Sequence, residues 1–472
     1  MLFNSIEFAL FLPIVFLLYW FLFQRNVRWQ NLFVVGVSYL FYGWWDWRFL
    51  ILIAFTSFCS WGSGLLIQRY RQRPLAKAVH VANIALNLII LGVFKYYDFF
   101  VTSFATMFLN GQTDGLLLKI ILPVGISFYT FQALSYSIDV YREKLKPTRD
   151  IIQFFAFVSY FPQLVAGPIE RATNLLPQFE KPRAFDYSQA VDGMRQILWG
   201  LFKKVAVADC CAVYVDHVFE NYQSQSGLTL AVAAVLFAFQ IYGDFSGYSD
   251  IAIGTSKLFG IRLMRNFNNP YFSRNIAEFW RRWHISLTTW FRDYVYIPLG
   301  GSRVPKAKVV RNTFVIFLLS GFWHGANWTF IAWGAFHALL FLPLILMEKN
   351  RKFTDDVAEG RFLPSISDMC RMLLTFMLVT LGWILFRADT ILQAWEYVMS
   401  IPHDGALYTH GVATSIACVL IMLVIEWIHR KRQHGLDLKC GSLPLRYLLY
   451  FTLIIIMFCV YSNSESFIYF QF

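Results

Sequence analysis

Residues 320–340 read SGFWHGANWTFIAWGAFHALL, an almost wholly apolar run that contains two histidines. Composition decides what surrounds them: of 472 residues, 57% are hydrophobic and only 15% are charged, and the mean hydropathy is +0.49. These values lie outside the range of soluble globular proteins. The sequence therefore predicts an all-α polytopic membrane protein, because helices satisfy their own backbone hydrogen bonds within lipid.

Apolar stretches long enough to cross a bilayer recur along the whole chain. We expect crossings near 4–23, 48–67, 78–96, 116–139, 228–260, 368–387, 411–428 and 445–461, and a shorter one at 31–43. We expect about eleven transmembrane helices, plus re-entrant or interfacial helices, in one membrane domain, 1–472. Its catalytic core would cover about 116–341, with N-terminal helices at 1–115 and C-terminal helices at 368–472.

The formal net charge of +12 first suggests a nucleic-acid partner, but the positive residues lie in short loops between the expected crossings. Every second loop is basic, which is the positive-inside pattern. It places residue 1 outside the cell and the loops near 70, 145 and 430 in the cytoplasm. We therefore expect anionic lipid headgroups at these loops and no nucleic acid.

Familiar cofactor and metal signatures are missing from the sequence. The seven cysteines show no C-x-x-C spacing, and the nine histidines show no H-x-x-x-H pair. No phosphate-binding loop, dinucleotide fingerprint or G-x-S-x-G elbow is present. We expect no metal and no tightly bound cofactor, so a nucleophile would have to come from the substrate.

Between residues 150 and 310 the chain departs from simple crossings. The stretch YFPQLVAGPIERATNLLPQF (160–179) interrupts its apolar run at Pro162, Gly167, Pro168 and Pro177. Such segments fit re-entrant or interfacial helices, and irregular backbone at membrane depth needs protein or a water-filled cavity around it. We therefore expect a cavity in this region.

Two carboxylates, Asp244 and Asp250, interrupt the apolar stretch YGDFSGYSDIAIG at 242–254. Ionisable groups within a membrane are costly and are usually paired or functional. One interpretation is a structural carboxylate paired with an arginine. The other places Asp244, Ser246 and Asp250 in the wall of a substrate site.

The stretch NPYFSRNIAEFWRRWHISLTTWFRDYVYIPLGG (269–301) contains a further histidine, His284. Asn275 can cap a helix with Glu278 three residues later. If that helix continues, Trp280, His284 and Thr288 share one face. An amphipathic helix lying at the membrane interface explains most of these residues, but it does not require His284.

His324 is the stronger candidate for chemistry. Basic residues flank the run 312–347 on both sides, and the run is shorter than the roughly 40 residues of two full crossings. His324 would lie near the turn, where Gly325 and Ala326 leave room for a close approach by substrate or backbone. His337 would lie about 20 Å away along a straight helix, and we interpret it as a hydrogen-bonded core residue. A neutral imidazole at position 324 can act as a general base for acyl transfer.

The two segments 269–301 and 320–337 together resemble the membrane-bound O-acyltransferases, and most closely the bacterial alginate O-acetylase type. The stretches FNSIEFALFLPIVFLLYW, PQLVAGPIERATNLLPQF, YGDFSGYSDIAIG and the C-terminal FIYFQF are also similar to that branch. The resemblance implies a ring of transmembrane helices around a thin centre that funnels reach from both sides. It implies that His324 is the catalytic histidine and His284 a second polar position. The further residues that we expect to contact substrate are Asp244, Ser246, Asp250, Arg281, Trp323, Asn327 and Trp328.

By the same resemblance, an acetyl group from a cytoplasmic thioester, acetyl-CoA or an acyl carrier protein, would be moved across the bacterial inner membrane. The acceptor would be an extracellular or cell-wall polysaccharide, and a separate periplasmic acetyltransferase partner would complete the transfer. His324 would be the general base, and His284 would orient the acceptor or stabilise the oxyanion.

Three alternatives stay open at this point. The same architecture carries D-alanyl transfer to teichoic acid and O-acetylation of peptidoglycan. A protein of a different class, a polysaccharide or ion transporter, could use Asp244, Asp250 and His324 as a proton relay.

Overall fold

The computed structural model describes residues 1–113, 115–165, 167–438 and 442–461. Across these ranges the regular structure is helical and contains no strand, which confirms the all-α prediction. The C-terminal FIYFQF lies outside the described residues. The chain forms two compact units: unit 1 comprises Met1–Met194 with Ala252–Met264, and unit 2 comprises Arg195–Ile251 with Arg265–Phe472.

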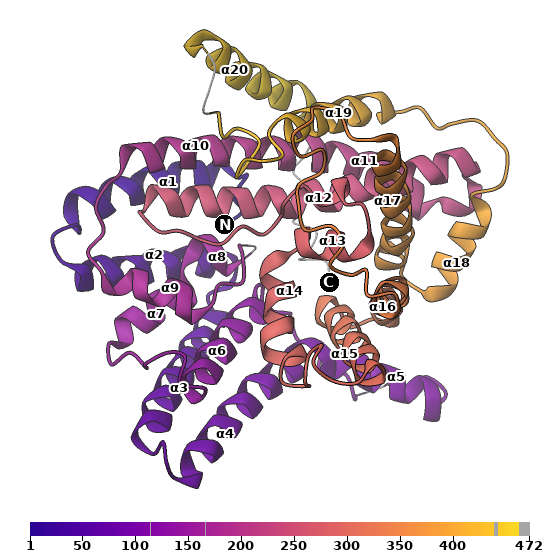
Figure 1. The fold of residues 1–472 in the computed structure, drawn as a ribbon. Coiled ribbons are helices and arrows are strands. Elements are labelled where there is room, and N and C mark those ends of the chain that lie inside the picture. The colour runs from indigo at the N-terminus through magenta and orange to yellow at the C-terminus, as the bar shows by residue number, and fades with distance from the viewer. Residues whose placement is uncertain (114, 166, 439–441, 462–472) are drawn as a thin grey trace. The chain divides into compact units, whose positions relative to one another are not determined.

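Unit 1 is built from the N-terminal helices and the last part of α12 (Figure 1). Its helices are α1 (Ile6–Leu17), η1 (Leu18–Leu22), α2 (Val27–Asp46), α3 (Phe49–Arg69), α4 (Pro74–Leu91), η2 (Gly92–Tyr96), α5 (Tyr97–Phe108), α6 (Ile126–Tyr141), α7 (Ile151–Ser159), α8 (Phe161–Leu164), α9 (Ala172–Glu180) and most of α10 (Tyr187–Leu201). The Tyr19 hydroxyl and the Trp20 indole donate to the Phe259 and Leu258 carbonyls, at 3.0 Å each. These bonds satisfy carbonyls at the end of α12, which have no partner within the helix.

Unit 2 holds the segments with the candidate histidines. Its elements are η3 (Phe202–Asp209), α11 (Cys210–Glu220), η4 (Tyr222–Ser224), most of α12 (Gly227–Leu258), η5 (Pro270–Phe272), α13 (Ile276–Arg282), α14 (Ile285–Phe291), η6 (Arg292–Tyr296), α15 (Lys306–His324), α16 (Trp328–Leu346), α17 (Ile366–Arg387), α18 (Ile391–Ser400), α19 (Val412–Ile428) and α20 (Leu443–Val460).

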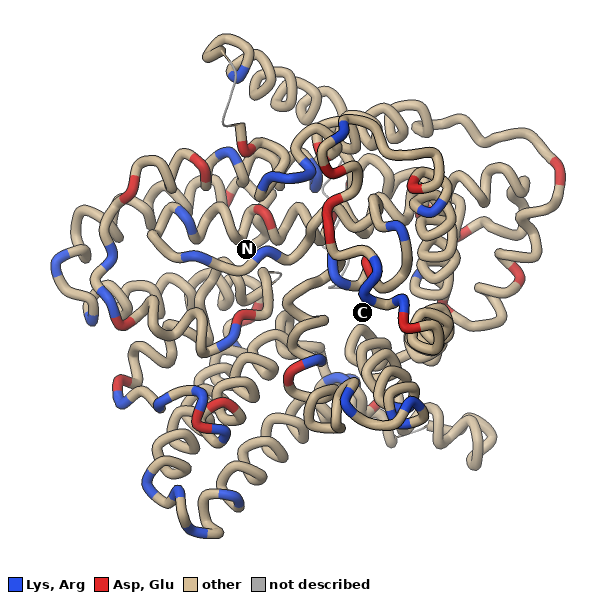
Figure 2. The backbone as a smooth tube through the Cα atoms, in the orientation of Figure 1, with Lys and Arg blue, Asp and Glu red and all other residues tan. Residues whose placement is uncertain are grey.

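Six of the described helices are long and apolar enough to cross a membrane: Phe49–Arg69, Pro74–Phe108, Gly227–Leu258, Trp328–Leu346, Ile366–Arg387 and Leu443–Val460. Ile6–Leu22 and Val412–Ile428 are shorter apolar helices. Lysines and arginines gather at helix ends and in loops (Figure 2). The long helix α12 also carries Asp244 and Asp250 within it. The chain is therefore a multi-pass membrane protein.

The start predicted for the crossing at 116–139 is wrong. Residues 116–122 are not helical, and α6 begins only at Ile126, after Pro123 and a left-handed Gly125 with φ of 74°. A Cβ at residue 125 would overlap the Leu164 carbonyl, so glycine serves the close approach as well as the backbone angle. The resulting helix has 16 residues.

Helices α15 and α16 form a hairpin that turns directly after His324. Gly325 is extended, and Asn327 caps α16 by accepting a hydrogen bond from the Thr329 N–H at 3.0 Å. The expectation of a straight helix from His324 to His337 is therefore wrong, because the chain reverses between them. Gly321 and Gly334 allow the two helices to pack closely, since a Cβ at either position would overlap a backbone carbonyl of the other helix.

The continuous helix expected through residue 284 is also wrong. Asn275 does cap α13, and its side chain accepts from the Glu278 N–H at 2.8 Å. However, α13 ends at Arg282, and His284 adopts a left-handed conformation, φ 41° and ψ 54°, before α14 starts. The shared face proposed for Trp280, His284 and Thr288 therefore does not exist.

The close packing of the hairpin predicts the effect of enlarging one glycine. We expect Gly334→Ala to destabilise the protein by about 1–3 kcal/mol, because the added methyl meets the Phe317 carbonyl and separates α15 from α16. Thermal unfolding of the purified protein in detergent measures this loss. Gly36→Ala in α2 is the matched control, since nothing lies within 4 Å of its Cβ position. Equal unfolding midpoints for the two variants would contradict the close approach.

Candidate active site

His324 is the last residue of α15 and is only 3% exposed. Its imidazole lies nearly perpendicular to three aromatic rings, with centroids at 5.0 Å from Trp323, 5.1 Å from Trp333 and 5.3 Å from Phe386. Edge-to-face contacts of this kind hold a ring in one orientation. The position at the helix end thus places His324 in an aromatic enclosure contributed by α15, α16 and α17.

The room expected beside His324 is already occupied. A Cβ at Gly325 would overlap the Phe330 ring, and that ring packs against Phe386 at 4.8 Å. The lack of a side chain at Gly325 therefore leaves the space that the Phe330 ring of α16 fills.

His284 lies at the junction of α13 and α14 and is 1% exposed. Its Nδ1 lies 3.1 Å from the Asn266 Oδ1, and its ring meets Phe245 of α12 edge-on at 4.7 Å. Burial lowers the pKa of His284, because desolvation disfavours the charged imidazolium. The group is therefore a neutral imidazole near pH 7.

The structure brings both candidate histidines into ring contact with one residue, Trp323. The Trp323 ring lies 5.8 Å from the His284 ring and 5.0 Å from the His324 ring, centroid to centroid. His284 and His324, forty positions apart in sequence, thus both contact the Trp323 indole. Trp323 was expected to contact substrate; in the structure its ring contacts both histidine rings.

His337 belongs to the same aromatic cluster. Its ring lies 4.9 Å from Trp333 and 5.0 Å from Trp280, and Trp333 also contacts His324. His337 is buried, as expected of a core residue, but neither of its nitrogens has a hydrogen-bond partner among the described residues. The expectation that it is hydrogen-bonded is therefore wrong. Trp333 and Phe386 had not been singled out from the sequence.

Asp244 and Asp250 are paired with lysines rather than with the expected arginine. Lys204 of η3 lies 2.8 Å from Asp244 and 2.7 Å from Asp209, and all three side chains are buried. Lys203 lies 2.5 Å from Asp250. The Gln196 amide donates to the same carboxylate at 2.7 Å. Adjacent lysines inside an apolar run, FKKVAVAD at 202–209, were the sequence signal for this network.

The other expected contact residues lie in different surroundings. Ser246 is buried on α12. Arg281 donates to the backbone carbonyls of Asn350 and Phe353. Asn327 donates to the Asp389 carbonyl at 2.9 Å, in addition to capping α16. Trp328 is 54% exposed.

A second buried charge cluster fixes α13. The Glu278 carboxylate accepts from Arg274 at 3.1 Å and from Arg282 at 3.0 Å. Both guanidinium groups also donate to the Asp355 carbonyl, so the loop after α16 is tied to α13. This cluster holds the helix that ends directly before His284.

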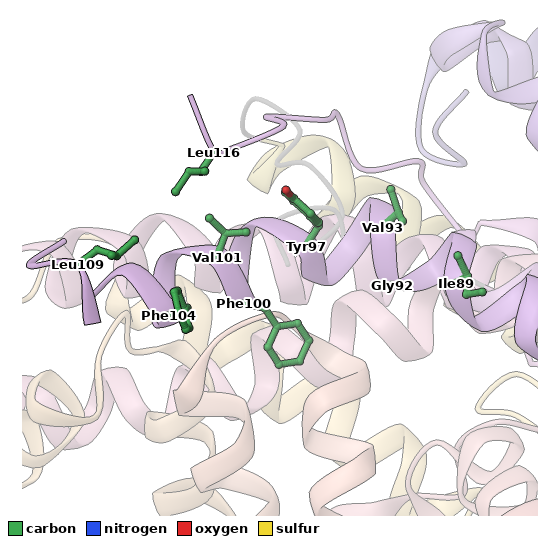
Figure 3. A pocket seen from close by; sticks show the side chains of 9 residues that line it. All are labelled: Ile89, Gly92, Val93, Tyr97, Phe100, Val101, Phe104, Leu109 and Leu116. Carbon is green, nitrogen blue, oxygen red and sulfur yellow. The ribbon is translucent and has the colours of Figure 1, made fainter. Parts of the chain in front are cut away.

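Two pockets are prominent in unit 1. One, of about 730 Å³, is lined by apolar side chains of α4, η2, α5 and Leu116 (Figure 3). The other, of about 470 Å³, lies where α3, α4 and the end of α6 meet, beside Arg71 and Lys146. Neither is lined by residues 150–310, where a cavity was expected, nor by His324. Among the described residues, no three His, Cys, Asp or Glu side chains are grouped to hold a metal ion.

Comparison with known proteins gives a consistent result. Residues 142–378 match the model of the membrane-bound O-acyltransferase family. The chain is 41% identical over 415 residues to a probable alginate O-acetylase of Pseudomonas putida, covering 87% of this chain and 81% of that one. It is 33% identical over 494 residues to a peptidoglycan O-acetyltransferase of Helicobacter pylori, covering 98% and 90%. It is 28% identical to a teichoic acid D-alanyltransferase of Bacillus subtilis, covering 56% and 68%.

The buried lysine predicts a large loss of stability on truncation. We expect Lys204→Ala to cost about 3–5 kcal/mol, because it leaves Asp209 and Asp244 buried without the ammonium group that pairs them. The unfolding midpoint in detergent measures the effect. Lys306→Ala, which removes an exposed pair with Glu348, should change it little. If Lys204→Ala were as stable as Lys306→Ala, the carboxylates would not depend on this lysine.

Proposed function

The chain belongs to the membrane-bound O-acyltransferase family and is an acyltransferase, and on that premise we propose that it acetylates a polysaccharide hydroxyl outside the cytoplasm. The acyl donor is a cytoplasmic thioester, acetyl-CoA. The observation that carries the proposal is the arrangement of His284 and His324 around the single indole of Trp323, inside the family-matched region.

The proposed reaction needs one base and no nucleophile from the protein. His324 takes the proton of the acceptor hydroxyl, and the oxygen attacks the thioester carbonyl carbon. The tetrahedral intermediate collapses, the C–S bond breaks, and the proton on His324 passes to the departing thiolate. The products are the acetate ester and free coenzyme A. His284 orients the acceptor or stabilises the oxyanion.

The expected contact residues are proposed in two groups. Asp244, Ser246 and Asp250 lie on α12, the helix whose Phe245 meets the His284 ring, and their contact with the acceptor is part of the proposal. Arg281, Asn327 and Trp328 make other contacts in the structure and would reach substrate only at the periphery.

The charge pattern of the loops supports the proposed orientation in a bacterial inner membrane. With the basic loops in the cytoplasm, residue 1 lies outside. A periplasmic acetyltransferase partner would complete the O-acetylation of the polysaccharide.

A second acceptor class is favoured by a specific observation. The peptidoglycan O-acetyltransferase of Helicobacter pylori matches 98% of this chain, more than the alginate O-acetylase does, although at lower identity. Peptidoglycan is therefore the alternative acceptor. D-Alanyl transfer is less favoured, because that relative matches only 56% of the chain. Family membership removes the transporter interpretation.

Removal of the proposed base should abolish most activity. We expect His324→Ala to lower acetyl transfer about 100-fold or more in reconstituted membranes, because general-base catalysis contributes at least that factor. His284→Asn should be milder, since an amide can still orient a hydroxyl. The exposed His410→Ala is the control. Near-normal transfer by His324→Ala would refute its assignment, and complete loss in His284→Asn would mean that the proton moves through His284.

Donor identity can be tested directly. Purified protein given acetyl-labelled acetyl-CoA and an acceptor should release coenzyme A in proportion to ester formed. D-Alanyl carrier protein offered in its place should give no transfer. An intact acetyl-CoA pool together with transfer from the carrier protein would reverse the assignment of the donor.

A further inference from the structure

Asn266 is hydrogen-bonded to His284 at the point where α13 gives way to α14. The segment 266–268 runs beside the break: the Ile285 N–H donates to the Asn266 carbonyl at 2.9 Å, and the Asn268 N–H donates to the Arg282 carbonyl at 2.9 Å. These two backbone bonds fix the Asn266 side chain next to the imidazole. The Asn266 side chain is buried, as are Ser249 and Ser286, which it also contacts.

The orientation of the Asn266 amide follows from its neighbours. Its Oδ1 accepts from the Ser286 N–H at 3.3 Å, and a backbone N–H can only donate, so the atom facing it must be the oxygen. Its Nδ2 donates to the Ser249 hydroxyl at 3.1 Å. The oxygen therefore also faces the His284 Nδ1 at 3.1 Å.

This arrangement determines which imidazole nitrogen carries the proton. An amide oxygen can only accept, and the Ser286 hydroxyl, 3.4 Å from Nδ1, donates to the same Asn266 oxygen at 2.9 Å. Nδ1 therefore donates, and a neutral imidazole has one N–H. The other nitrogen, Nε2, then carries a lone pair. Nε2 is buried and has no hydrogen-bond partner among the described residues. In this tautomer His284 cannot donate to an oxyanion, so of its two suggested roles only that of orienting the acceptor remains.

We propose that Asn266 is a positioning residue that holds His284 as an acceptor, so that Nε2 binds a hydroxyl of the substrate next to the hydroxyl that reacts. This inference rests on the proposed function. The reacting hydroxyl has a single proton, which goes to His324, so the hydroxyl bound by His284 must be a neighbouring one. The substrate class is therefore a sugar with adjacent hydroxyls.

The left-handed conformation of His284 fits this role. A non-glycine residue with φ of 41° stores strain, and such residues concentrate where a site needs a side chain in one exact direction. The segment 266–268 makes backbone hydrogen bonds to the Arg282 carbonyl and to the Ile285 N–H, on the two sides of His284. The left-handed conformation therefore depends on the same segment that supplies the Asn266 side chain.

The tautomer can be measured without any activity. ¹⁵N NMR of protein labelled at histidine nitrogens, with the His284 signals identified by their loss in His284→Asn, should show a protonated Nδ1 and an unprotonated Nε2. Asn266→Ala should allow both tautomers, whereas Asn266→Asp keeps an acceptor facing Nδ1. A protonated Nε2 in the unsubstituted protein would overturn the proposal.

Transfer assays test the substrate class. The probes are a methyl glycoside with adjacent hydroxyls and its deoxy analogue, which lacks the hydroxyl next to the reacting one. We expect about a 3- to 10-fold preference for the glycoside, as one neutral hydrogen bond gives. The preference should disappear in His284→Ala and Asn266→Ala and persist in Asn266→Asp. Equal rates with the two probes, or transfer to neither, would count against the proposal.

A double variant separates positioning from general damage. If Asn266 acts through His284, adding Asn266→Ala to His284→Ala should cause no further loss, whereas additive losses would contradict the proposal. Asn312→Ala, which removes a buried asparagine bonded to the Leu299 and Gly301 carbonyls, controls for stability and should keep the preference. Failure of His324→Ala to lower transfer would refute the proposed function alone, because the NMR result does not depend on it.

Discussion

Backbone polar groups in an apolar interior need partners, and this constraint decides where the two histidines can lie. A helix that stops inside such an interior leaves N–H and C=O groups without intrahelical bonds. At the end of α13, the segment 266–268 supplies the missing bonds. At the end of α15, the chain reverses and Asn327 caps the next helix. His284 and His324 each lie at one of these helix ends, where the backbone groups have partners and a side chain can contact residues from several helices.

The aromatic rings around the breaks have a related function. Trp323, Trp333 and Phe386 surround His324 edge-on. They leave His324 only 3% exposed and hold its orientation by edge-to-face contacts. The buried pairs of Lys203 and Lys204 with the carboxylates of α12 fix η3 against that helix, which also contributes Phe245 to the His284 ring. Charge pairing thus holds η3 against α12, and aromatic packing surrounds His324.

Much of this could be predicted from local sequence. Hydropathy and loop charge indicated a helical multi-pass protein, Asn275 indicated the start of α13, and the basic flanks of 312–347 indicated a turn near His324. The break at His284 could not be predicted, because its partners lie 14 to 19 residues earlier in sequence and no local pattern marks a left-handed histidine. The straight-helix spacing of His324 and His337 failed because the chain turns directly after His324. The pairing of Asp244 and Asp250 with lysines required knowing which elements pack on α12.

The central claim is that His284 and His324 serve one reacting centre around Trp323. An experimental structure of the protein with a non-hydrolysable thioether analogue of acetyl-CoA tests it most directly. The claim predicts that the carbonyl carbon of the analogue lies within reach of the His324 imidazole, on the side that His284 also faces. An analogue bound with its carbonyl group away from both rings, and the aromatic enclosure still closed around His324, would contradict it.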